Sequence, residues 1–116
     1  MKIIIAGCRE ISDYDAVASA IESCNIEIDT VLSGGCRGVD LCGEQWAADH
    51  QILIEKYPAE WHLFGRAAGI IRNQKMVDSA DALIAIVSTK YQGRGTASII
   101  KMANKKGLPV YVREIS

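Results

Sequence analysis

Short apolar runs alternate with amphipathic stretches along the chain, and this alternation restricts the fold more than any other feature. Continuous apolar runs of this length are typical of strands buried on both faces. The stretches between them repeat apolar residues with the spacing of one helix face, as in the series from Val17 to Cys24. The expected strands are Ile3–Ala6, Thr30–Leu32, Ile52–Ile54, Ala82–Val87 and Pro109–Val112. The order predicts an α/β fold, a Rossmann-like doubly wound parallel five-stranded sheet with helices on both faces.

The connections between these elements restrict the topology further. Right-handed crossovers favour the strand order 3-2-1-4-5, with a switch point between the first and fourth strands where ligands bind.

The sequence also predicts where the helices and one loop lie. We expect Ser12 to cap the first helix. A helix from about Ala67 to Ala80 should offer Ile70 and Val77 to the core, and Gly107 should end the last helix. Residues 57–61 are expected to form a loop.

Length, charge and cysteine usage exclude several classes of protein. The chain has 116 residues, which predicts one domain spanning residues 1–116. A formal net charge of -1 argues against nucleic-acid binding, and no apolar run approaches a membrane span. Gly7 and Arg9 interrupt the first apolar run, so it is typical of a strand and not of a signal peptide. The cysteines lack metal-ligand spacing, which predicts no metal and reduced thiols in the cytoplasm. They are Cys8, Cys24, Cys36 and Cys42.

The segment from Ser33 to Asp40 has the sequence of an anion-binding turn. It reads S-G-G-C-R-G-V-D and joins a predicted strand to a predicted helix. Glycines there allow a ligand to approach the backbone, and the N–H groups of the next helix stabilise an anion. Arg37 adds a charged fork that suits a phosphate or a carboxylate. The segment therefore predicts a phosphate-type site.

Other glycines and arginines follow the first and fourth strands, and an Arg-Asn pair lies near the start of the third helix. Because the carboxyl ends of parallel strands meet at one edge of a sheet, we expect these residues to lie together. The candidate ligand residues are Gly7, Arg9, Ser33, Gly34, Gly35, Arg37, Gly38, Arg72, Asn73, Gly93, Gly95 and Thr96.

Each candidate has a purely structural explanation as well. Any strand-to-helix loop can require glycine, and Asp40 is explained by the preference of helix starts for acidic residues. Arg72 is equally explained by an ion pair with Asp78 or Asp81. Trp61 could stack on a base, although tryptophans are more often core or rim residues. No catalytic constellation stands out, and the candidates for acid/base chemistry are Glu60 and Asp40.

Taken together, these segments resemble the SLOG superfamily. Residues 33–40 match its S-G-G-x-R-G-[VI]-D motif. The superfamily includes DprA-type DNA-processing proteins and the LOG cytokinin-activating enzymes. The rest of the chain is similar to a small single-domain family related to YspA. The matching segments are Tyr57–Trp61, Gly65–Gly69, Ile71–Asn73, Asp81–Ile86 and Gly95–Thr96.

The resemblance implies a pocket for a nucleotide or a nucleotide-derived ligand. Gly34, Gly35, Arg37 and Gly38 would form one wall, Arg72 and Asn73 another, and Gly93, Gly95 and Thr96 would hold phosphate. LOG enzymes carry a catalytic glutamate in the pattern P-G-G-x-G-T-x-x-E. Residues 91–99 match this span, and Ile99 stands at the glutamate position.

The presence of Ile99 in place of the LOG glutamate makes some functions more plausible than others. An apolar side chain cannot transfer a proton or stabilise an oxocarbenium ion, so we expect binding, sensing or sequestration of a nucleotide ligand without a cofactor. The alternative is a hydrolase that cleaves an N-glycosidic or phosphoester bond. Single-stranded DNA binding, as in DprA, is disfavoured by the balanced charge. Assembly into homo-oligomers stays open, and the resemblance fits a bacterial or phage source.

Overall fold

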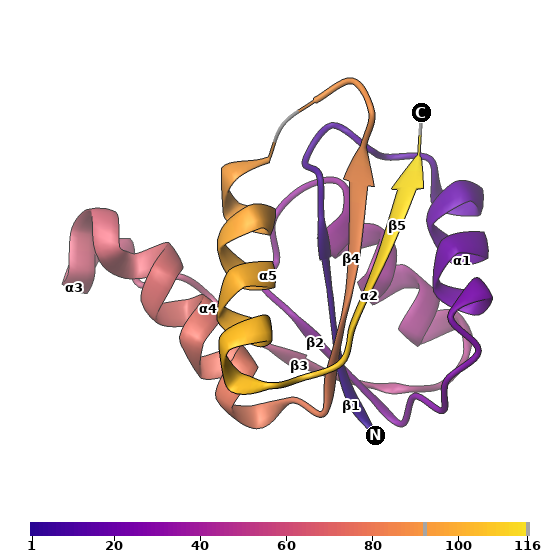
Figure 1. The fold of residues 1–116 in the computed structure, drawn as a ribbon, viewed down its shortest axis with the longest axis horizontal. Coiled ribbons are helices and arrows are strands. Elements are labelled where there is room, and N and C mark those ends of the chain that lie inside the picture. Colours follow the sequence, from indigo (N-terminus) through magenta and orange to yellow (C-terminus); the bar gives the residue numbers. More distant parts are fainter. Residues whose placement is uncertain (92, 116) are drawn as a thin grey trace.

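A computed structural model describes residues 1–91 and 93–115, and within them five strands form one parallel sheet in the order β3-β2-β1-β4-β5 (Figure 1). β1 lies between β2 and β4, with Ile3 opposite Val31 on one side and Ala82 on the other. The predicted fold class and strand order are confirmed. The strands are β1 (Lys2–Gly7), β2 (Thr30–Ser33), β3 (Leu53–Lys56), β4 (Ala82–Ser88) and β5 (Val110–Ile115).

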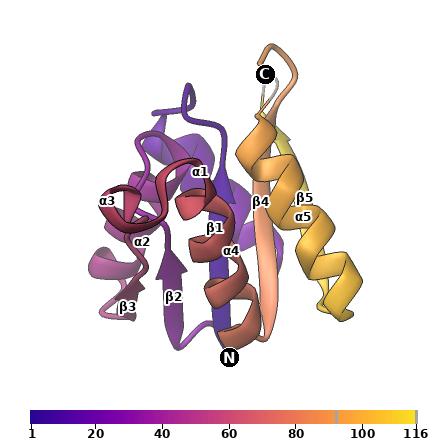
Figure 2. The ribbon, with the colours of Figure 1, turned by 90° about the vertical axis from the view of Figure 1, so that its left-hand side faces the viewer.

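Two pairs of helices cover the two faces of the sheet (Figure 2). One face carries α1 (Tyr14–Ser23) and α2 (Val39–Asp49), and the other carries α4 (Ala68–Ser79) and α5 (Arg94–Lys106). Before α4 the chain forms a short helix, α3 (Trp61–Phe64), and a single 3₁₀ turn, η1 (Gly65–Ala67). The helices are too short and too polar to cross a membrane in the part of the chain that is described.

The core consists of two layers, one on each side of the sheet. Successive side chains of a strand point to opposite faces, so Ile3 and Ile5 pack under α1 and α2 while Ile4 packs under α4 and α5. All three side chains are fully buried, and burial of one such side chain is worth about 1.5–3 kcal/mol. The central strands therefore hold the carboxyl edge of the sheet in a fixed position.

Several predicted boundaries shift by a few residues. Asp13, and not Ser12, caps α1, because its Oδ1 accepts a hydrogen bond from the Ala16 N–H at 3.2 Å. The third strand begins at Leu53 and the last strand continues to Ile115. Gly107 ends α5 in the left-handed conformation, as predicted.

The segment before α4 projects away from the sheet (Figure 1). The residues from Trp61 to Ala67 form α3 and η1, and none of them is buried. The loop expected over residues 57–61 thus ends in a helix. The expectation for Ile70 is wrong: it is 57% exposed, because the first turn of α4 continues this projection, whereas Val77 is fully buried.

Candidate functional site

A cavity of about 320 Å³ opens at the carboxyl edge of β1 and β4, where the strand order reverses. Its wall combines the end of β1 and the loop after it, the β2–α2 turn with the first turn of α2, the middle of α4 and the start of α5. The lining residues are Ala6, Gly7, Cys8, Arg9, Glu10, Cys36, Asp40, Arg72, Asn73, Met76, Tyr91, Gly93, Arg94, Gly95, Thr96 and Ile99. The location agrees with the switch point expected for ligand binding.

Arg72 is a buried cation in this wall, only 9% exposed. Its Nε donates to Asn73 Oδ1 and its Nη1 donates to the Gly34 carbonyl, both at 2.8 Å. Its Nη2 lies 4.0 Å from the Cys36 sulfur. Among the described residues, no carboxylate oxygen lies within 4.0 Å of the guanidinium. Its partners are therefore neutral, and its charge is uncompensated at contact distance.

The ion pairs considered for Arg72 do not form. Asp78 is bound by Gln74 at 2.9 Å and lies 3.4 Å from Lys106 Nζ, and Asp81 accepts a hydrogen bond from the Lys2 N–H at 2.7 Å. Neither carboxylate is available to the cavity.

Asp40 is the buried carboxyl group of the cavity. It lies in the first turn of α2, and its Oδ2 accepts a hydrogen bond from the Cys36 N–H at 3.2 Å. Burial raises the pKa of Asp40 to about 6, although the Cys36 hydrogen bond and the charge of Arg72 oppose this rise. The Asp40 carboxyl therefore changes charge close to neutral pH.

The absence of a side chain at Gly34 allows the Arg72 and Asp40 side chains to pack closely against the turn. A Cβ at this position would lie 2.8 Å from Arg72 Nη1 and 3.1 Å from Asp40 Oδ2. A larger residue would displace one of the two groups. Gly34 is thus required by the close packing of the charged groups.

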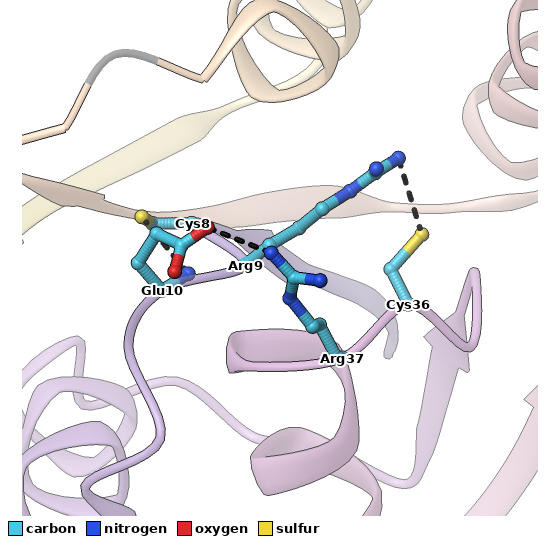
Figure 3. A network of polar contacts seen from close by, with 5 residues as sticks. All are labelled: Cys8, Arg9, Glu10, Cys36 and Arg37. Atoms are coloured by element: carbon cyan, nitrogen blue, oxygen red, sulfur yellow. Dashed lines mark hydrogen bonds and ion pairs between the residues drawn. The ribbon is translucent and has the colours of Figure 1, made fainter.

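The rim of the cavity is a polar network between the β1–α1 loop and the β2–α2 turn (Figure 3). Arg9 Nη2 lies 3.9 Å from the Cys36 sulfur, and Arg37 Nη2 forms an ion pair with Glu10 Oε1 at 2.8 Å. Arg37 is exposed and does not line the cavity, whereas Glu10 does. The Arg37 charge therefore acts on the cavity through Glu10.

The start of α5 forms the opposite wall. The first helical hydrogen bond runs from the Ala97 N–H to the Gly93 carbonyl, so the N–H groups between them have no acceptor in the helix. The first turn holds Arg94 and no acidic residue, which leaves the positive end of the helix dipole uncompensated. Gln92, which belongs to the segment 91–99 compared above with the LOG pattern, lies outside the described residues.

Some of the twelve candidate ligand residues lie in the cavity wall and others do not. Those in the wall are Gly7, Arg9, Arg72, Asn73, Gly93, Gly95 and Thr96. Those outside it are Ser33, Gly34, Gly35, Arg37 and Gly38. Ser33 is fully buried and donates to Glu44 Oε2 at 2.7 Å.

Of the two acid/base candidates, Asp40 lines the cavity and Glu60 does not. Glu60 directly precedes α3 and lies 3.8 Å from Lys75 of α4. Sequence reasoning missed Glu10 and Tyr91, which line the cavity. Glu10 directly follows Arg9 in the same predicted loop, so its position along the chain was the available signal. Ile99 is buried and also lines the cavity, so an apolar side chain occupies this part of the wall.

Comparison with known proteins identifies a family and a relative of this chain. The sequence model of the YspA, cpYpsA-related SLOG family (YAcAr) matches residues 1–64, which include the turn at residues 33–40 but not α4 or α5. The chain is 29% identical over 118 residues to the Gene 61 protein of Mycobacterium phage D29, with 94% of this chain and 93% of the relative aligned. The phage relative fits the expected bacterial or phage source. No solved structure matches the chain.

Proposed function

Because the chain belongs to the YspA, cpYpsA-related SLOG family, we propose that it binds, senses or sequesters a nucleotide or a nucleotide-derived phosphorylated ligand at the carboxyl edge of its sheet. The four cysteines are free thiols and three of them are buried, which supports a reducing compartment such as the cytoplasm for this role.

The observation that carries the proposal is the buried guanidinium of Arg72, which forms no ion pair among the described residues although the Asp40 carboxyl lies nearby. Burial of a charge is costly unless an opposite charge compensates it. An anionic ligand in the cavity would supply that charge, and a hydrogen bond to a charged group is worth about 1.5–3 kcal/mol.

The charges around Arg72 also favour an anion. Arg9, Arg72 and Arg94 line the described part of the cavity, against the carboxyl groups of Glu10 and Asp40. Glu10 is already paired with Arg37, and the pKa of Asp40 is raised to about 6. The start of α5 adds N–H groups that suit a phosphate.

A second part of the site suits a sugar. Asp40 and Asn73 offer carboxyl and amide oxygens beside Arg72, and hydroxyl groups of a ribose can donate to such oxygens. A phosphate at α5 and a ribose at α2 and α4 would together occupy the cavity between these elements. The proposed ligand is therefore a phosphorylated nucleoside or a derivative of one.

Calorimetric titration tests this function directly. The purified protein is titrated with inorganic phosphate, the ribonucleoside monophosphates, ADP-ribose and cyclic dinucleotides. We expect at least one nucleotide to bind, and Arg72→Met to weaken that binding about tenfold to a hundredfold. Arg113→Met is the matched control, since Arg113 contacts Ser23 and lies outside the cavity wall. Absence of binding by every nucleotide, or an equal effect of the two substitutions, would contradict the proposal.

The raised pKa of Asp40 supports a second candidate function, hydrolysis of a nucleotide. A carboxyl group with a pKa of about 6 in a cavity has the properties of a general acid. Incubation of nucleoside monophosphates with the protein, followed by chromatography, would then show release of base or phosphate, and Asp40→Asn would abolish it. Intact substrate at high protein concentration would leave binding as the function.

A further inference from the structure

Trp61 is a large exposed aromatic side chain beside the cavity. It begins α3 on the projecting segment and is 57% exposed, whereas Trp46 is 6% exposed. A tryptophan side chain has a large apolar surface, and such surface is favourable to cover. Among the described residues, Trp61 belongs neither to the hydrophobic core nor to the cavity wall, so neither explains why a tryptophan stands at this position.

The Trp61 indole and the Arg72 guanidinium both lie close to Gly69. A Cβ built at Gly69 would lie 3.6 Å from Trp61 Cη2 and 3.9 Å from Arg72 Nη2. Because Gly69 has no side chain, the space between the ring and the buried cation stays open. The indole therefore adjoins the group that we propose binds the anionic part of the ligand.

We propose that Trp61 is the stacking platform for the base of a nucleotide whose phosphorylated part is held by Arg72 and the start of α5. This inference rests on the proposed function and specifies the ligand, which must carry an aromatic base. Flat π faces stack on indole rings with little dependence on base identity. The cavity wall itself contributes one further aromatic side chain, Tyr91.

A second copy of the chain is the competing occupant of this surface. Three more apolar side chains are exposed, Leu63 and Phe64 on the projecting segment and Ile70 in the first turn of α4, and they would suit a contact between copies. Trp61 differs from them because its ring adjoins Arg72 across Gly69. This position beside a cavity cation favours a charged aromatic ligand over an apolar protein surface.

The test compares probes with and without a base. Ribose 5-phosphate and the four ribonucleoside monophosphates are titrated into the wild-type protein and into Trp61→Ala, Trp61→Phe and Leu63→Ala. We expect a nucleotide to bind roughly tenfold to a hundredfold more tightly than ribose 5-phosphate and to quench tryptophan fluorescence. Trp61→Ala should remove this preference without weakening ribose 5-phosphate, and Trp61→Phe should keep most of it. Leu63→Ala is the matched control, 62% exposed on the same helix, and should change neither affinity.

The other outcomes separate the two proposals. Equal affinities for ribose 5-phosphate and every nucleotide, or a base preference that survives Trp61→Ala, would overturn the stacking role while leaving the proposed function intact. Failure of all probes to bind would overturn both. A dimer in sedimentation that Trp61→Ala and Leu63→Ala both dissociate, without any base preference, would assign the surface to a second copy.

Discussion

Arg37 illustrates how a residue outside the cavity can still influence it. Its guanidinium pairs with Glu10 at the rim, and Glu10 lines the cavity. Arg37→Met would leave the Glu10 charge unpaired, so we expect nucleotide affinity to fall severalfold at low salt and less at high salt. In a Glu10→Gln background the same Arg37→Met substitution should have no further effect.

This double-mutant cycle is measured by calorimetry with any nucleotide that binds. An undiminished effect of Arg37→Met in the Glu10→Gln background would show that Arg37 contacts the ligand directly, as the resemblance to the SLOG superfamily implies. Exposed pairs contribute about 0–1 kcal/mol to stability, so the folding of all three variants should stay close to that of the wild type.

Asp40 should make the folded protein less stable as the pH rises. Its pKa rises from 3.8 to about 6 on folding, mainly through burial, so ionisation costs about 3 kcal/mol more in the folded chain. Between pH 4 and 6 the folded state binds more protons at this group than the unfolded state, and its contribution to stability is lost as pH rises.

Asp40→Asn removes this titration. The free energy of unfolding of the variant, measured by urea denaturation from pH 4 to pH 7, should therefore rise relative to the wild type as pH increases, with most of the change between about pH 4 and pH 6. Parallel profiles of the two proteins would contradict the raised pKa.

The sequence could predict which loops form the site more reliably than which side chains face it. Arg72 and Asn73 line the cavity at the expected edge, because a helix that follows a parallel strand begins at the carboxyl edge of the sheet. Ser33 lies at the same edge but does not line the cavity, because the alternating direction of side chains in β2 turns it inward to Glu44. Such orientations depend on rotamers and partners from other elements, which the pattern of one segment does not contain.

At the scale of elements, Gly38 couples the β2–α2 turn to the β1–α1 loop. It has φ of 81° and ψ of -128°, and a Cβ there would lie 2.5 Å from the Cys8 carbonyl oxygen. Gly35 has φ of 75°, but no atom lies within 4 Å of its Cβ position. Gly35 and Gly38, two of the three glycines of the motif, are thus required for different reasons.

Alanine at these positions should therefore have unequal costs. Gly38→Ala combines backbone strain with a clash against main-chain atoms and should cost about 3 kcal/mol or more. Gly35→Ala carries only the strain of a left-handed residue, about 1–2 kcal/mol. Urea midpoints measure both, and equal midpoints would show that the loops shift to accept the Gly38 Cβ.

The predicted elements agree best with the structure where burial determines them. The apolar runs of β1 and β4 correctly predict that these segments are strands and that they lie in the centre of the sheet. Both faces of these strands are covered, and such strands are apolar along their whole length. The α3 segment was missed because four residues are too few to show a helical period. The expectation for Ile70 failed because periodicity identifies a helix face but not how far the helix extends past the sheet.

The whole molecule combines a rigid sheet with a projecting segment of low burial. Amides of β1 and β4 lie among fully buried side chains and should exchange with solvent hydrogen only on global unfolding. No residue of α3 or η1 is buried, so amides of residues 61–67 should exchange many times faster in the free protein. Hydrogen exchange followed by mass spectrometry measures this contrast directly.

The same measurement identifies what covers the projecting segment. A nucleotide stacked on Trp61 should slow exchange in residues 61–67 together with the loop after β1 and the first turn of α5, because one ligand would contact all three. Ribose 5-phosphate should slow only the last two. Protection of residues 61–67 in the free protein that disappears on dilution would instead show that a second copy covers the segment, and it would rule out an indole available to a base.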